Sequence, residues 1–180
     1  MTLKIIQTGD PVLRRIARSL SLDEIRSEWT TRLIEEMRDT MRAAPGVGLA
    51  APQIGESIQL AVIEDRIDYT SDVSSEELAQ RQRSPVDFHV IINPKISIIG
   101  DDTVDFFEGC LSVEGFVAKV PRATNIRVEC VNERAEPIMI DAHGWYARIL
   151  QHEIDHLNGT LYIDQMQTRS FSTVENISRR

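Results

Sequence analysis

The segment His152-Glu153-Ile154-Asp155-His156 constrains this chain more than any other, because it has the form H-E-x-x-H. Side chains four positions apart on an α-helix lie on one face, so both imidazoles are able to reach a single metal ion. Glu153 is then placed to take a proton from a metal-activated water molecule. A solvated polar helix face is the alternative, but Trp145 and Ile149 share this face and need burial. The motif therefore predicts a metal centre on a partly buried helix.

The remaining pattern predicts an α+β fold with antiparallel or mixed sheets. Apolar residues recur every three or four positions over 22–41, which is typical of one amphipathic helix, and Ser21 with Glu24 forms a capping box at its start. A second helix is predicted from about 144 to 158, with Gly159 ending it. Short runs rich in Ile and Val predict strands at 58–63, 88–93, 95–99, 116–120, 125–131 and 137–141. Helix, several strands, then helix is not the alternating order of a parallel sheet.

Length and charge narrow the class of protein. The 180 residues predict one domain over 1–180, with a polar surface insertion at 66–87 and a C-terminal tail at 165–180. The 28 acidic residues outnumber the 20 lysines and arginines, and a net charge of −8 argues against general affinity for nucleic acid or anionic membranes. No apolar run is long enough to span a bilayer, and no secretory signal is recognised. Two free cysteines in a reducing compartment are therefore expected, and Cys130 alternates with apolar residues as a buried strand residue does.

A catalytic metal site needs a third protein ligand and an open position. A histidine six residues beyond the motif would serve in one class of metalloprotease, but that position holds Tyr162. Glu175, His89, His143 and Cys110 all remain candidates. Glu175 would make the protein a gluzincin-type endopeptidase. A structural, non-catalytic metal site would need a fourth protein ligand that closes the coordination sphere.

A glycine-containing segment at 46–55 is the third feature that suggests chemistry. It is not a phosphate loop, because it follows a helix and lacks the lysine and the spacing of one. Its glycines allow the backbone to approach a ligand closely, and the amide of Gln53 is able to stabilise an oxyanion. Taken alone, such a segment is more often only a turn.

Together the three segments resemble the motifs of the peptide deformylase family. They stand in the family's order as G-x-G-L-A-A-x-Q at 46–53, E-G-C-x-S at 108–112 and Q-H-E-x-D-H at 151–156. Residues 9–13 resemble the family's usual opening, and 144–149 with 161–164 resemble the subgroup that includes mitochondrial and plant organellar members. The resemblance covers nearly the whole chain except the insertion and the end of the tail.

The resemblance implies sheets packed around a central C-terminal helix that carries the H-E-x-x-H motif. It implies a metal-dependent hydrolase that removes the formyl group from N-formylmethionine of nascent polypeptides, by attack of a metal-bound water and release of formate. Its metal ligands would be Cys110, His152 and His156. Glu153 would act as general base and then as proton donor, and Gln53 with the backbone N–H of Leu111 would form the oxyanion hole.

The family's substrate contacts, ion and partners follow from the same resemblance. Backbone groups of Val47, Gly48 and Gly109 would hold the peptide as an added strand, and the methionine pocket would be lined by Val47, Trp145, Ile149 and His152. Fe²⁺ is the expected native ion, with Zn²⁺, Ni²⁺ or Co²⁺ as alternatives. The expected partners are N-formylmethionyl nascent peptides and, as a transient candidate, the ribosome, without a membrane or a direct nucleic-acid site. The expected compartment is the bacterial cytoplasm or an organellar matrix or stroma, not the secretory route.

Overall fold

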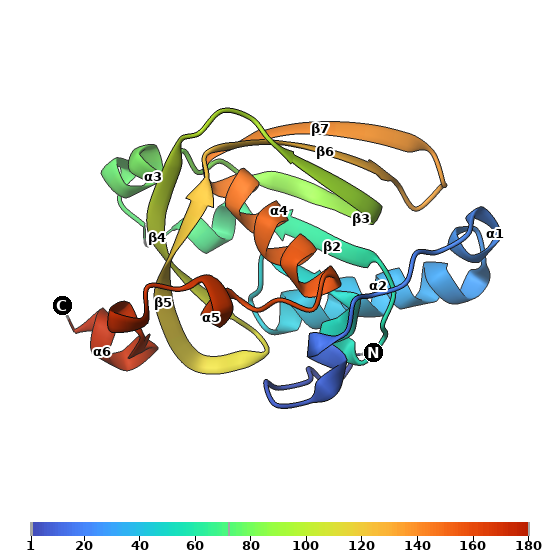
Figure 1. Ribbon diagram of the computed structural model, residues 1–180, viewed down its shortest axis with the longest axis horizontal. Coiled ribbons are helices and arrows are strands. Elements are labelled where there is room, and N and C mark those ends of the chain that lie inside the picture. The colour runs from blue at the N-terminus through green and yellow to red at the C-terminus, as the bar shows by residue number, and fades with distance from the viewer. Residues whose placement is uncertain (1, 72, 180) are drawn as a thin grey trace.

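The computed structural model describes residues 2–71 and 73–179, and its strands form two antiparallel sheets (Figure 1). The longer sheet has the order β1-β2-β3-β6-β7, with strands Gly48–Ala50, Leu60–Asp65, Val86–Ile98, Asn125–Val131 and Pro137–His143. The shorter sheet has the order β4-β5-β8, with strands Thr103–Cys110, Val113–Ala123 and Ser172–Thr173. Every ladder between these strands is antiparallel, so the predicted α+β class is confirmed.

The helix α4, Gly144–Leu157, lies at the centre of the fold and carries the H-E-x-x-H motif (Figure 1). Its apolar face belongs to a buried cluster that includes Leu150 and Ile154 of the helix with Ile63 and Ile91 of the longer sheet. The Gln151 side chain accepts from the backbone N–H of Ala123 at 3.1 Å and donates to its carbonyl at 2.9 Å, which ties α4 to the end of β5. The helix is therefore held by both sheets.

The single helix predicted over 22–41 is wrong in one respect, because the structure forms two helices there. The first, α1, covers Leu22–Ile25, and its predicted capping box of Ser21 and Glu24 is confirmed. The second, α2, covers Glu28–Ala43, and its N-cap is Ser27, which has an extended backbone and whose side chain accepts a hydrogen bond from the backbone N–H of Thr30. The expected apolar stripe is also shorter, since Leu22 and Trp29 are 54% and 47% exposed.

Most of the strands differ from their predicted bounds, including β2 and β7, which both end two residues later than expected. The two strands expected over 88–93 and 95–99 are one strand, β3, whose register shifts between Ile92 and Lys95, where Asn93 has φ +53°. The strands β1, β4 and β8 were not predicted, and β5 is longer than expected at both ends. The strand β6 has the predicted bounds, and in it Cys130 is a buried free thiol whose pKa burial raises to about 11.

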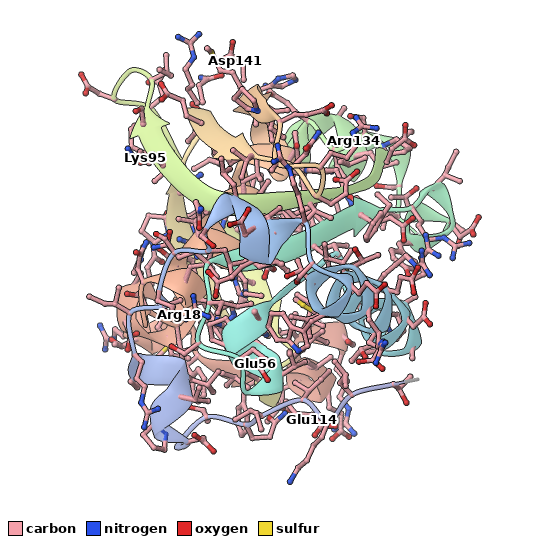
Figure 2. The ribbon with its side chains drawn as sticks, turned by 90° about the vertical axis from the view of Figure 1, so that its right-hand side faces the viewer. Arg18, Glu56, Lys95, Glu114, Arg134 and Asp141 are labelled. Atoms are coloured by element: carbon pink, nitrogen blue, oxygen red, sulfur yellow. The ribbon has the colours of Figure 1, made fainter. Side chains whose placement is uncertain are left out.

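The short elements complete the chain. They are the helices α3, Ser75–Arg81, α5, Tyr162–Gln165, and α6, Val174–Ser178, and the 3-10 helices Pro11–Arg14, Ala51–Ile54, Ile67–Thr70 and Thr168–Ser170. Gly159 follows Asn158, the C-cap of α4, as predicted, and has φ +72°. Charged side chains of both signs, Lys95, Arg134, Asp141 and Glu114 among them, point outward (Figure 2). Within the described residues, no helix is both long and apolar enough to cross a membrane.

Candidate metal centre

Cys110, His152 and His156 converge where the end of β4 meets α4. Their candidate ligand atoms all lie within 4.8 Å of one another, and Cys110 Sγ is 3.2 Å from His156 Nε2. Among residues 2–71 and 73–179, these three residues form the one group of at least three histidine, cysteine or carboxylate side chains whose ligand atoms are close enough to hold an ion. A thiolate and two imidazoles suit Zn²⁺ or Fe²⁺ and leave one coordination position open.

The other candidate ligands lie elsewhere. Glu175 is exposed in α6 and pairs with Arg179. His89 of β3 is bonded through Nε2 to the hydroxyl of Tyr146 at 2.9 Å, and His143 is exposed at the N-cap of α4. None of these three candidates belongs to the group at Cys110, so neither the gluzincin ligand set nor a closed site with four protein ligands is formed within the described chain.

A buried carboxylate orients one of the candidate ligands. Glu108, 6% exposed, accepts a hydrogen bond from His152 Nδ1 at 3.0 Å, from Arg122 at 2.9 Å through two nitrogens, and from Arg148 at 2.6 Å. Burial alone would raise the pKa of Glu108, but the hydrogen bonds from Arg122 and His152 outweigh it and hold that pKa well below its usual range. The carboxylate therefore fixes the His152 ring with Nε2 left for an ion.

Sequence reasoning did not identify this support for His152. Glu108 stood in the second motif without a role, and Arg148 stood four residues before His152 on the same helix face, which was the available signal. Arg122 carried no local signal, because its contacts with Glu108 and, at 2.5 Å, with Asp155 join segments far apart in the chain.

Glu153 is a buried carboxylate with unmet hydrogen-bonding capacity. It is 4% exposed, and its Oε2 has no partner among the described residues. Burial raises the pKa of Glu153 to about 7. A carboxyl group with a free oxygen and a pKa near neutral, next to three candidate metal ligands, is suited to accept a proton from water on a bound cation.

Gln53 also lies close to Cys110. Its Oε1 accepts from the backbone N–H of Ala50 at 2.8 Å, which aims the amide nitrogen towards Ser112 Oγ at 3.2 Å and Cys110 Sγ at 3.6 Å. The segment around it is more than a turn, since residues 48–50 form β1 and 51–54 form a 3-10 helix. The geometry thus places a buried side-chain N–H donor beside the thiol.

A cleft of about 340 Å³ opens at this centre. Its lining includes every residue that the sequence analysis named for the site except His156, namely Val47, Gly48, Gln53, Gly109, Cys110, Leu111, Trp145, Ile149, His152 and Glu153. Phe116 of β5 and Val174 of α6 also line it, and the sequence analysis had not placed them there. The cleft therefore combines an apolar wall with converging donors, as ligand sites commonly do.

Comparison with known proteins gives consistent results. The family model described as polypeptide deformylase matches residues 2–172. The chloroplastic peptide deformylase 1A of Solanum lycopersicum is 50% identical over 173 residues, which are 96% of this chain and 62% of that protein. The chloroplastic/mitochondrial peptide deformylase 1A of Arabidopsis thaliana is 45% identical over 97% of this chain and 65% of its own length. The chain thus spans less than two thirds of the length of these two relatives.

A solved structure shares the fold. The class I type b peptide deformylase of Acinetobacter baumannii, crystallised with Met-Ala-Ser bound, superposes with a TM-score of 0.82 and 30% identity. The match covers 92% of this chain and 99% of that one. The similarity therefore extends over the sheets and helices that build the cleft.

Proposed function

Because this chain belongs to the peptide deformylase family, we propose that it is a metal-dependent hydrolase that removes the formyl group from the N-terminal formylmethionine of nascent polypeptides. The observation that carries the proposal is the convergence of Cys110, His152 and His156 at a cleft that Glu153 and Gln53 also line. In the reaction the oxygen of water bonds to the formyl carbon and the carbon–nitrogen bond breaks. Formate and a free N-terminal amine are the products.

The ion would be held by Cys110, His152 and His156. A divalent cation at these ligands supplies Lewis acidity, which makes water a stronger acid and polarises a carbonyl group. We propose iron(II) as the native ion, with zinc, nickel or cobalt as alternatives that the same donors accept. Metal analysis of protein purified without oxygen tests this. The iron form should lose activity in air and the nickel form should keep it, and equal stability of the two forms in air would count against iron.

Glu153 has the role of proton carrier in this proposal. It takes one proton from the attacking water and gives it to the amine nitrogen as the carbon–nitrogen bond breaks. Its burial and its pKa of about 7 support the role, because a group with a pKa near neutral both accepts and releases a proton readily.

Gln53 and the backbone N–H of Leu111 would stabilise the negative charge that develops on the formyl oxygen. The support is the orientation of the Gln53 amide, whose oxygen is already occupied by the Ala50 N–H, so that its nitrogen is directed to the cleft. Donors fixed before the reaction act mainly in the transition state, because no reorganisation is needed when charge appears.

The peptide would bind along backbone groups of Val47, Gly48 and Gly109. The support is topological, since β1 and β4 are the outer strands of their sheets and, within residues 2–71 and 73–179, each has one edge without a strand partner. The methionine side chain would enter the apolar part of the cleft at Val47, Trp145, Ile149 and His152. The Met-Ala-Ser bound to the Acinetobacter enzyme supports a ligand with methionine first.

We propose that residues 1–180 act as one domain with the 66–87 insertion and the 165–180 tail. The stacking of Phe171 on Phe116, with centroids 5.0 Å apart, supports a tail that packs on β5. N-formylmethionyl nascent peptides are the proposed partners, and the ribosome that delivers them is a transient candidate. The names of the two plant relatives support an organellar matrix or stroma, and the bacterial cytoplasm is the alternative compartment.

One assay tests the proposal. The full chain, loaded with Fe²⁺ without oxygen or with Ni²⁺, should release formate from formyl-Met-Ala-Ser and leave internal peptide bonds intact, as mass spectrometry would show. An endopeptidase would cut internal bonds and spare the formyl group. Metal-loaded, folded protein that releases no formate would overturn the proposal.

A further inference from the structure

We propose that Arg81, the last residue of α3, positions the indole of Trp145. Arg81 thereby determines which side chains the cleft accepts at the N-terminal residue of the peptide substrate. The inference rests on the proposed function, because it concerns the same substrate pocket. Arg81 does not line the cleft itself, whereas Trp145 does. Arg81 is therefore a positioning residue that acts through the ring.

The indole of Trp145 is held by stacking contacts. The guanidinium carbon of Arg81 lies 4.7 Å from the ring centroid, and those of Arg83 and Arg148 lie at 5.4 and 5.8 Å. Phe106 of β4 packs edge-on against the same ring at 6.1 Å. The indole nitrogen Nε1 is buried and has no hydrogen-bond partner in the described chain. Because no hydrogen bond fixes the ring, its orientation depends on these contacts, and Arg81 makes the closest cationic one.

The segment that carries Arg81 contacts the rest of the fold at two points, the end of β2 and the start of α4. Arg83 donates two hydrogen bonds of 2.8 Å to Asp65 at the end of β2, and both side chains are almost fully buried. Gly144, the first residue of α4, has φ +57°, and a Cβ there would lie 2.6 Å from the Cβ of Gln82. The backbone after Arg81 therefore packs directly on the start of the helix that bears Trp145.

The placement of α3 agrees with this role. In Figure 1 α3 lies beside β4, and the guanidinium of Arg81 is also 5.8 Å from the ring of Phe106 in that strand. Glu77, one turn earlier on α3, forms an ion pair with Arg81. The insertion thus forms an outer layer behind one wall of the pocket. One methylene group more or less in a hydrophobic pocket changes discrimination between substrates by roughly 10–200-fold.

Fluorescence tests the contact without relying on activity. The chain has two tryptophans, so a Trp29→Phe background leaves Trp145 as the only one. In that background Arg81→Ala should move the emission of Trp145 to longer wavelength, because water reaches the uncovered ring. Arg81→Gln keeps a polar side chain but removes the planar cation, and it should shift the emission of Trp145 in the same direction. Arg66→Ala is the matched control, since Arg66 lies in the same insertion but stacks on Tyr69 at 5.9 Å.

Substrate choice tests the consequence. The ratio of kcat/KM for formyl-Met-Ala-Ser over formyl-Phe-Ala-Ser should fall by about tenfold in Arg81→Ala and Arg81→Gln and stay unchanged in Arg66→Ala. An unchanged emission, or an unchanged ratio in both Arg81 variants while the wild-type protein is active, would overturn this inference alone. A wild-type protein that releases no formate from either peptide would overturn the proposed function and this inference together.

Discussion

Gly48 and Glu153 lie so close together that position 48 has no room for a side chain, since an ideal Cβ there would be 2.2 Å from Oε1 of Glu153. A methyl group at this position must push the buried carboxylate out of place. We therefore expect Gly48→Ala to lower kcat by about 10²-fold, the lower part of what a general base contributes. The circular dichroism spectrum and the metal content should match the wild type. A Gly48→Ala protein with normal kcat would argue that Glu153 does not carry the proton.

Replacing Glu153 by glutamine should keep the fold and the ion but remove most activity. The amide occupies the same space and cannot accept the proton, and a general base contributes about 10²–10⁴ to the rate. The measurements are kcat with formyl-Met-Ala-Ser and metal content by elemental analysis. Loss of the ion at an unchanged fold would mean that Glu153 is a ligand instead.

Gln53→Ala should lower kcat by about 10²–10³ with a smaller change in KM, because an oxyanion donor acts mainly in the transition state. Steady-state kinetics on the metal-loaded variant separate the two constants. A rise confined to KM would show that Gln53 only holds the substrate.

Glu108→Ala should be strongly destabilising. It leaves Arg148 as a buried cation without a carboxylate and leaves Arg122 with Asp155 alone, each arginine being 3% exposed in its side chain, and breaking such a buried network costs about 3–5 kcal/mol. Thermal unfolding should show the loss as a lower Tm. Arg127→Ala, which breaks an exposed pair with Asp141, is the control and should leave Tm unchanged. If Glu108→Ala had the same Tm as the wild type, Glu108 would not be the carboxylate that stabilises Arg122 and Arg148 in the folded protein.

Cys110→Ser should greatly weaken metal binding and activity, while Glu175→Ala should change neither. Serine remains an un-ionised alcohol near neutral pH and replaces a thiolate poorly as a ligand, and Glu175 lies exposed in α6 beside Arg179. Metal content after dialysis against a weak chelator distinguishes the two variants. The assignment of the ligands fails if Glu175→Ala loses the ion and Cys110→Ser retains it.

The sequence was sufficient to predict ten residues of the cleft because most of them belong to short motifs with local geometry, but it did not point to Phe116 or Val174. His152 and His156 share a helix face by spacing alone, and Gly48 and Gln53 lie within six residues of each other. Helix ends were predictable for the same reason, as Ser21 with Glu24 and Gly159 show. The chemical roles given to these residues stay predictions until the variants above are measured.

The sequence did not predict features that depend on distant segments. Arg122 and Arg148 meet Glu108 across 14 and 40 residues of chain, and no periodicity reports such a contact. The break before α2 was missed because Ser27 interrupts the apolar pattern only by capping Thr30, which propensity alone does not reveal. The strand β4 was missed because its polar residues and Gly109 obscure the alternation that marks a strand.

The distance along the chain between Cys110 and His156 has a consequence for how the protein matures. The two proposed ligands are separated by 46 residues, so a ribosome working at about 5–20 residues per second makes the thiol roughly 2–9 s before the second imidazole. Until His152 is made, near the end of that interval, the cysteine has no partner with which to share an ion and is open to oxidants. The proposed site is thus complete only after His156 is made, and oxidation of Cys110 before then would remove the thiolate from the proposed ligand set.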